Sequence, residues 1–166
     1  MNPDIDTVWE VHFDRSVTSL DVYSYPVWHA LPGSEVCRDH AFVDVLDGYS
    51  HSIRIGGVTG PIGAYVRSSS YYQLLLNKFS SLELDLYHRG TLEGYIEIEH
   101  EAVDGVSTTV RRALVACEGA SYTFRRYRAD LTALPDCTVS QLRFVFNVKD
   151  DQPLCSVNIG RIALKL

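Results

Sequence analysis

The chain has 166 residues, 46% of them hydrophobic and 22% charged, and a formal net charge of −6. A chain of this length is enough for one compact domain, burying roughly 68–70% of the surface that its unfolded form exposes, so we expect a single domain over residues 1–166 with residues 1–6 loosely held. The acidic charge and the lack of a concentrated Lys/Arg patch exclude the basic surface that nucleic-acid binding needs.

The N-terminal residues carry no pattern of a secretory signal. The opening MNPDIDTVWEVHFD contains four acidic residues, where such a signal needs a basic start followed by an apolar run. No apolar stretch approaches the ~20 residues of a membrane helix, so membrane insertion is not expected. For localisation, the sequence leaves open a non-exported protein, an excised module of an extracellular protein and a component of a virus particle.

Apolar and polar residues alternate with a period of two along most of the chain, which predicts strands with one buried side. Leu82, Leu84 and Leu86 are an example, since acidic or tyrosine residues separate and follow them. Gly- and Asp-containing turns such as Pro32-Gly33 punctuate these runs. The predicted strands are 7–13, 17–23, 41–46, 51–56, 61–67, 81–88, 91–101, 107–117, 121–130, 140–148 and 155–164. This pattern predicts an all-β antiparallel sandwich or barrel.

The segment 23–33 is rich in aromatic residues and is interrupted by two prolines, so it is predicted to be a loop. Tyr25, Trp28 and His29 are candidate ligand-binding residues there, because aromatic rings cover the C–H face of a sugar while polar neighbours bond its hydroxyls. The alternative is that Tyr25 and Trp28 only fill one end of the sandwich.

Two further groups of residues are candidates for ligand contact. Tyr71 and Tyr72 are adjacent, so in a strand they cannot both face the core; packing or a subunit interface is the alternative. The outward-facing residues of the strands could line a binding groove across one sheet, or they could simply be solvated. The candidate groove residues are Tyr87, Tyr95, Glu97, Arg111, Arg143 and Asn147.

Register gives a separate expectation for two hairpins. If 91–101 and 107–117 fold back on each other, Glu97 lies near Arg111 and Tyr95 near Ala113, and the ion pair adds about 0.2–1 kcal/mol. If 140–148 and 154–164 also form a hairpin, Cys155 lies opposite a residue near Asn147. The four cysteines then do not suggest a disulfide framework, and we interpret them as reduced or buried.

The order of several motifs resembles the galactose-binding-like jelly-roll β-sandwich modules, many of which bind carbohydrate without cleaving it. The resemblance rests on TVWEVHFD near the start, GYSHSIRI at 48–55, and SYTFRRYRADLTAL, QLRFVF and SVNIGRIAL in the last third. It implies a two-sheet antiparallel jelly roll. In many of these modules an acidic residue in the last strand helps to hold a structural calcium ion; this chain has Gly160 and Arg161 there, so no metal or other cofactor is expected.

Catalytic motifs are missing from the sequence. It contains no His-x-His pair, no His-Glu-x-x-His and no Gly-x-Ser-x-Gly, so no catalytic residue is assigned; a jelly-roll polysaccharide lyase or a glycosidase is the minor alternative. The function predicted is a non-catalytic carbohydrate-binding module with poly- or oligosaccharide as partner, and Tyr95 and Arg111 complete its candidate site. The alternative is a structural or receptor-binding module of a larger assembly, such as a phage tail or spike, with a homo-oligomer or flanking domains as its partners.

Overall fold

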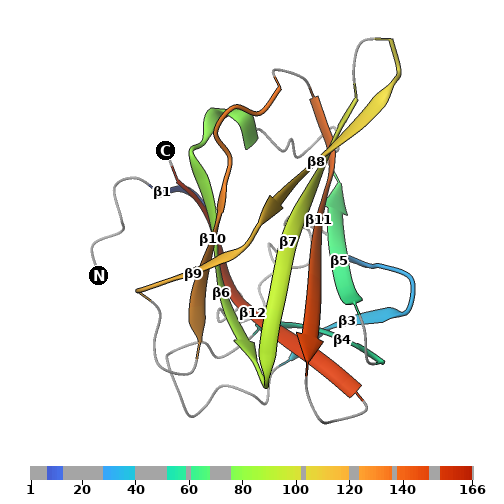
Figure 1. The fold of residues 1–166 in the computed structure, drawn as a ribbon, viewed down its shortest axis with the longest axis vertical. Helices are drawn as coiled ribbons and strands as arrows, with labels where there is room; N and C mark the ends of the chain where they lie inside the picture. The colour runs from blue at the N-terminus through green and yellow to red at the C-terminus, as the bar shows by residue number, and fades with distance from the viewer. Residues whose placement is uncertain are drawn as a thin grey trace, which may run out of the picture.

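The structure is a computed structural model, and it describes residues 7–12, 28–39, 52–58, 61–67, 76–101, 104–119, 124–135, 138–149 and 154–165. These residues form strands and one short 3-10 turn, η1 (Leu76–Lys78) (Figure 1). The strands are β1 (Thr7–His12), β2 (His29–Ala30), β3 (Ser34–Asp39), β4 (Ser52–Val58), β5 (Pro61–Arg67), β6 (Ser81–His88), β7 (Thr91–Glu101), β8 (Ser107–Ala113), β9 (Val115–Cys117), β10 (Arg125–Asp130), β11 (Thr138–Lys149) and β12 (Leu154–Lys165). In this part of the chain, no helix has the length and apolar character needed to cross a membrane.

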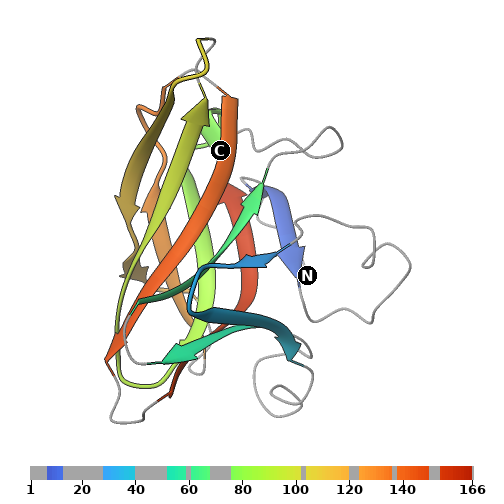
Figure 2. The same ribbon diagram turned by 90° about the vertical axis from the view of Figure 1, so that its right-hand side faces the viewer.

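The strands build two sheets in which every pairing is antiparallel. One sheet has seven strands in the order β3-β4-β12-β6-β10-β9, with β1 also paired to β12. The other has five strands in the order β2-β5-β11-β7-β8. Figures 1 and 2 show the two sheets stacked as layers.

The core lies between the sheets and consists of the apolar residues that alternation predicts. From the seven-stranded sheet, Leu82, Leu84 and Leu86 are fully buried, and from the five-stranded sheet so are Ile96, Ile98 and Phe146. Burying side chains of this size contributes about 1.5–3 kcal/mol each. The prediction of an all-β, two-sheet antiparallel sandwich of jelly-roll type is therefore confirmed.

Several strand boundaries differ from the sequence prediction. The predicted strand 107–117 is broken at Leu114, where the chain leaves the five-stranded sheet as β8 and joins the seven-stranded sheet as β9. Strands β2 and β3 were not predicted, because prolines and Gly33 obscure the alternation around them. The predicted strands 17–23 and 41–46 lie outside the described residues.

The predicted pairing of 140–148 with 154–164 is wrong. Strand β11 lies in the five-stranded sheet and β12 in the seven-stranded sheet, so the two strands belong to different layers of the sandwich. Cys155 faces the interior, where its thiol donates a hydrogen bond to the carbonyl of Val148 over 3.4 Å. Alternation predicted both strands correctly but carries no information on which sheet each one joins.

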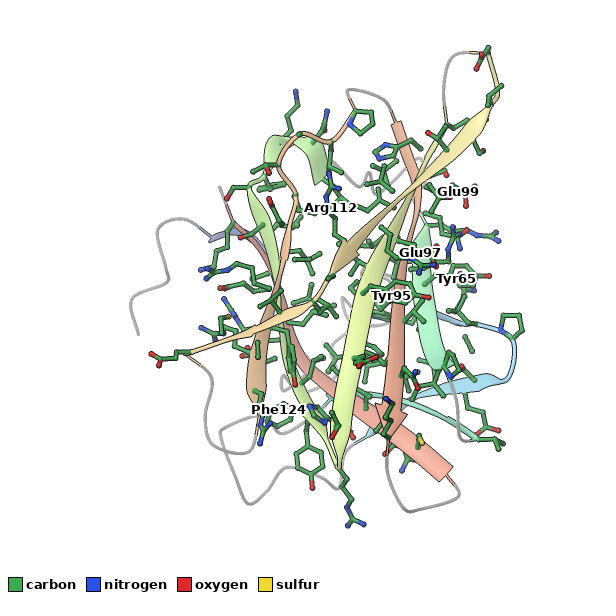
Figure 3. All side chains as sticks on the ribbon, viewed as in Figure 1. Tyr65, Tyr95, Glu97, Glu99, Arg112 and Phe124 are labelled. Atoms are coloured by element: carbon green, nitrogen blue, oxygen red, sulfur yellow. The ribbon has the colours of Figure 1, made fainter. Side chains whose placement is uncertain are left out.

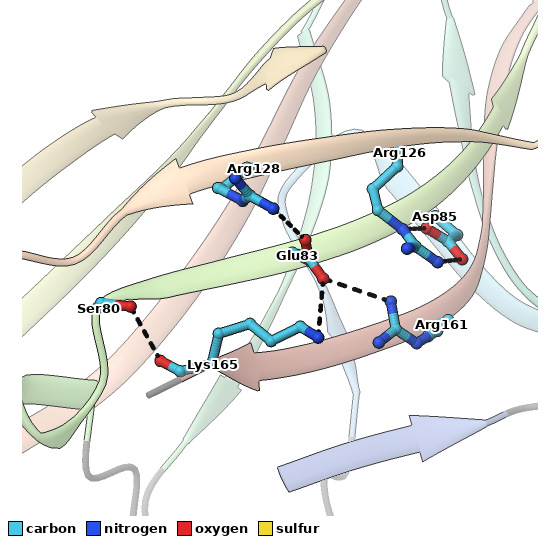
Figure 4. Close-up of polar contacts among 7 residues, drawn as sticks. All are labelled: Ser80, Glu83, Asp85, Arg126, Arg128, Arg161 and Lys165. Atoms are coloured by element: carbon cyan, nitrogen blue, oxygen red, sulfur yellow. Dashed lines mark hydrogen bonds and ion pairs between the residues drawn. The ribbon is translucent and has the colours of Figure 1, made fainter. Parts of the chain in front are cut away.

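The seven-stranded sheet carries a cluster of charged side chains on its outer face (Figure 4). Glu83 accepts a hydrogen bond of 2.7 Å from Arg128 and lies 3.6 Å from both Arg161 and Lys165. Next to it, Arg126 binds both oxygens of Asp85, at 2.8 and 3.1 Å. Glu83 and Asp85 are 2% and 0% exposed, so both carboxylates are shielded from solvent, as are Arg161 and Lys165, whereas the Arg128 side chain is 52% exposed. We call this group the charge cluster.

Candidate functional site

The outer face of the five-stranded sheet collects aromatic and charged side chains from every strand of that sheet. Because side chains alternate along a strand, the residues between the core positions of β5, β7 and β11 all point away from the sandwich. We call this surface the polar face; its residues are His29, Tyr65, Arg67, Tyr95, Glu97, Glu99, Arg111, Gln141, Arg143 and Asn147. Figure 3 labels Tyr65, Tyr95, Glu97 and Glu99, which lie along β5 and β7.

Register places five of these residues in one row across all five strands. Arg111 on β8 is opposite Glu97 on β7, and Glu97 is opposite Arg143 on β11. Arg143 is in turn opposite Tyr65 on β5, and Tyr65 is opposite His29 on β2. Neighbouring strands are about 4.8 Å apart, so this row extends about 19 Å across the sheet. It is long enough to contact several units of a chain-like ligand.

At one end of the row, Arg111, Glu97 and Tyr95 form a compact group. The guanidinium carbon of Arg111 lies 3.9 Å from the centre of the Tyr95 ring, which is a cation–π contact. Arg111 also lies 3.6 Å from Glu97, and the Arg111 side chain is 60% exposed. An exposed ion pair at this distance contributes little stability, so Arg111 can exchange it for another partner at low cost.

At the other end of the row, Tyr65 lies among basic groups. The Tyr65 and His29 rings are stacked, with centroids 5.0 Å apart and an angle of 19° between their planes. The guanidinium of Arg67 lies 5.2 Å from the centre of the Tyr65 ring. These contacts hold the tyrosine ring in a fixed orientation at the surface.

Between the two ends, Arg143 donates a hydrogen bond of 2.8 Å to Glu99, and both side chains are partly exposed. Gln141 and Asn147 on β11 add amide groups on the same face. The polar face therefore offers donors and acceptors next to two tyrosine rings. Such a surface can hold a ligand that carries both hydroxyl groups and apolar C–H faces.

Three of the residues predicted as ligand-binding are on this face: His29, Tyr95 and Arg111. The predicted register of Glu97 with Arg111, and of Tyr95 with Ala113, is confirmed. Trp28 instead points inward, where its ring packs 5.3 Å from that of Phe144, as in the packing alternative. Tyr25, Tyr71 and Tyr72 lie outside the described residues, so ligand contact by them stays a prediction.

The placement of Tyr87 corrects the sequence interpretation. Tyr87 was grouped with Tyr95 as a residue of one face, but it lies on β6 in the seven-stranded sheet, opposite Asn158 on β12. Its ring is 6.2 Å from that of the buried Phe124. Alternation correctly excluded Tyr87 from the core but could not tell which of the two outer faces it occupies.

Sequence reasoning missed Tyr65, Arg67 and Glu99 as residues of the site. The signal was present, because Ile62, Ala64 and Val66 are the buried positions of β5 and the residues between them must face outward. What the sequence did not show is that β5 and β7 both pair with β11.

The described residues contain no group of three or more His, Cys, Asp or Glu side chains arranged to hold a metal ion. At the place in the last strand where many of the resembling modules have an acidic residue that helps to hold calcium, this chain has Arg161, whose guanidinium lies 3.6 Å from Glu83 in the charge cluster. Its positive charge is unfavourable for a cation at the same place.

No protein-family model and no curated protein sequence matches this chain. Solved structures with the same fold do match this chain. The CBM22-1 xylan-binding domain of Paenibacillus barcinonensis Xyn10C superposes with a TM-score of 0.57 at 11% identity, covering 97% of this chain and 94% of that domain. The CBM22-1 module in the CBM22-1–GH10 structure of Clostridium thermocellum xylanase 10B, solved with xylohexaose, gives 0.57 at 13% identity, over 97% of this chain and 28% of that one. The family 30 carbohydrate-binding module of C. thermocellum Cel9D-Cel44B gives 0.52 at 14%, over 78% and 81%. At these identities the likeness shows a shared β-sandwich fold.

Proposed function

We propose that this chain is a non-catalytic carbohydrate-binding module and that its ligand lies across the polar face. The observation that carries the proposal is the row from Arg111 to His29, which crosses all five strands with tyrosine rings beside it. The sandwich fold is shared with modules whose names describe binding to xylan, and one of those structures contains xylohexaose.

The charge of the polar face favours a neutral ligand. The outward side of strands β5, β7, β8 and β11, which includes the polar face and the strand ends beside it, carries four basic residues, Arg67, Arg111, Arg143 and Lys149, and four acidic ones, Glu93, Glu97, Glu99 and Glu101. These charges sum to zero, so neither a polyanion nor a polycation gains from long-range attraction. A neutral saccharide can instead donate hydroxyl protons to the carboxylates and accept from the guanidinium groups.

The carboxylates of this face support binding rather than hydrolysis. Glycoside hydrolysis needs one carboxyl group as an acid and a second as a base or nucleophile, on the two sides of the bond to be cleaved. Here Glu97 lies between Arg111 and Arg143, and Glu99 accepts a hydrogen bond from Arg143. Each carboxylate thus has an arginine partner on the sheet.

Calorimetric titration with xylo- and cello-oligosaccharides, together with pull-down on insoluble xylan and cellulose, tests this function. We expect weak binding, which Tyr95→Ala and Tyr65→Ala each reduce by about tenfold, equal to about 1.4 kcal/mol. Tyr87→Ala is the matched control, because it removes the same side chain from the outer face of the other sheet.

Two results would contradict the proposal. One is the absence of binding to every saccharide in the panel, and the other is an equal loss of affinity in Tyr87→Ala and Tyr95→Ala. Release of reducing ends from any of these substrates would contradict the non-catalytic part.

A further inference from the structure

The outer face of the seven-stranded sheet contains a hollow, which the proposed function does not use. Its volume is about 490 Å³, and it is lined by Gly33, which directly precedes β3, and by residues of β4 and of its neighbours β3 and β12: Glu35, Arg54, Gly56, Gly57, Val58, Cys155 and Ser156. Figure 1 shows these three strands side by side at the lower end of the sandwich. We call this hollow the Gly56 trough.

Register explains the shape of the trough. Gly56 on β4 is opposite Glu35 on β3 and opposite Ser156 on β12, so it lies between these two side chains. Arg54 and Val58 precede and follow it on the same face of β4. The missing side chain of Gly56 therefore leaves an opening with a wall on each of four sides. Sheet geometry makes the opening about 10 Å wide between β3 and β12 and about 13 Å long from Arg54 to Val58.

Packing in the fold does not require glycine at position 56. Among the described residues, a Cβ atom built there would meet only the carbonyl oxygen of Cys155, at 3.6 Å, which is an ordinary contact. At Gly57, by contrast, a Cβ atom would come within 2.6 Å of the Ile62 side chain and 2.8 Å of the Gly33 carbonyl oxygen. Glycine inside a strand is less stable than alanine and often marks a place where a ligand approaches the backbone. Close packing against Ile62 and Gly33 therefore explains why residue 57 is glycine, whereas the opening explains why residue 56 is glycine.

We propose that the Gly56 trough is a second binding site for a small neutral saccharide, one or two sugar rings in size. Glu35 provides an acceptor, Arg54 provides donors, and the Ser156 hydroxyl can do either. Val58 is 69% exposed and gives an apolar wall for the C–H face of a sugar ring. The volume is within the range of small-molecule sites, and one carboxylate with one guanidinium leaves the site without net charge.

The trough and the polar face are on opposite sides of the sandwich, because they belong to the outer faces of different sheets. The two sites can be occupied at the same time, and they can be removed by separate substitutions. Failure of one proposal therefore leaves the other standing. If both are present, one molecule can contact two polysaccharide chains, and its retention on an insoluble polymer exceeds that of either site alone.

The test is a titration of the ¹⁵N-labelled 166-residue chain with xylose, glucose, galactose and cellobiose, followed by amide chemical shifts. We expect at least one of these sugars to shift the amides of Glu35, Gly56 and Ser156 as a saturating group. Gly56→Val fills the opening with a side chain suited to strands, so it should weaken this binding by more than tenfold while its Tm stays equal or rises. Glu35→Gln, which keeps the shape of an exposed side chain, should weaken the same binding without unfolding the protein.

Tyr95→Ala is the control, since it should leave the trough shifts intact while it reduces binding on the polar face. The proposal is overturned if none of the four sugars shifts the trough amides, or if Gly56→Val and Glu35→Gln bind as the unaltered chain does. It is also overturned if the shifts are spread over the whole surface.

Discussion

Replacing Glu83 by glutamine removes one negative charge from the charge cluster and keeps the size and shape of the side chain. The glutamine oxygen can still accept the hydrogen bond from Arg128, but Arg161 and Lys165, each 3.6 Å from the carboxylate, lose its charge. The side chains of Arg161 and Lys165 are only 7% and 9% exposed, so water cannot solvate these two cations in place of the carboxylate. Removing one partner of such a buried ion pair costs about 3–5 kcal/mol.

Glu97→Gln on the polar face is a matched control for this prediction. Its partner Arg111 is also 3.6 Å away, but that arginine side chain is 60% exposed. An exposed ion pair contributes about 0–1 kcal/mol, so Glu97→Gln removes the same charge from a solvated contact, whereas Glu83 also has a second cation at 3.6 Å and a 2.7 Å hydrogen bond from Arg128.

Urea unfolding at pH 7 measures the unfolding free energies of Glu83→Gln and Glu97→Gln. The two values can be compared if both variants unfold with the same m-value as the unaltered chain. We expect the loss of unfolding free energy in Glu83→Gln to exceed that in Glu97→Gln by about 3 kcal/mol. Equal losses would refute the reasoning, since they would mean that burial does not determine the strength of these contacts.

The same variant has a consequence for acid stability. Burial opposes the charged form of Glu83, but the hydrogen bond from Arg128 and the charges of Lys165 and Arg126 outweigh it and hold its pKa below the ordinary value. The contribution of Glu83 to the free energy of unfolding is therefore complete above pH about 4.3, which is the pKa of glutamate in the unfolded chain. It is lost as the pH falls through the pKa of Glu83 in the folded protein. Glu83→Gln should be less sensitive to acid over this range.

Three further predictions concern other parts of the sandwich. Gly57→Ala should lower Tm while Gly56→Ala does not, because only the first places a Cβ atom against Ile62 and a backbone oxygen; equal melting curves would contradict this. Burial lowers the pKa of His88, whose Nε2 lies 2.7 Å from the Tyr127 hydroxyl, so the free energy of unfolding should decrease as the pH falls below about 6.5. His88→Asn should flatten that part of the pH profile, and an unchanged slope would exclude His88 as its cause. Phe144→Ala should cost about 3–5 kcal/mol in urea unfolding, since the ring is 1% exposed; a loss below 1 kcal/mol would show that the core rearranges to fill the space.

Much of the fold could be predicted from the sequence because alternation reports directly on burial. The strands at 61–67, 81–88 and 91–101 were predicted with the boundaries that the structure has. Sheet membership could not be predicted in the same way, since a strand in either sheet has the same alternation. This is why the pairing of β11 with β12 was wrong and why Tyr87 was placed with Tyr95.

The candidate site was predictable only in part, for a related reason. Tyr95 and Arg111 were found because they belong to one hairpin, whose register can be deduced locally. Tyr65 joins them only through β11, a pairing between distant segments. Alternation also marks Glu83 and Asp85 as solvent-facing, whereas the structure buries them. Alternation does not report which side chains cover an outer face.

The break at Leu114 affects how this module behaves at high local concentration. On this side of the sandwich β8 ends one sheet and β9 ends the other, with one buried residue between them. Unpaired strand edges invite pairing with further copies, and natural proteins limit this by keeping such edges short and charged. Here β9 has three residues, and β8 carries Arg111 and Arg112. Many copies at high local concentration should therefore stay separate instead of joining edge to edge into fibrils.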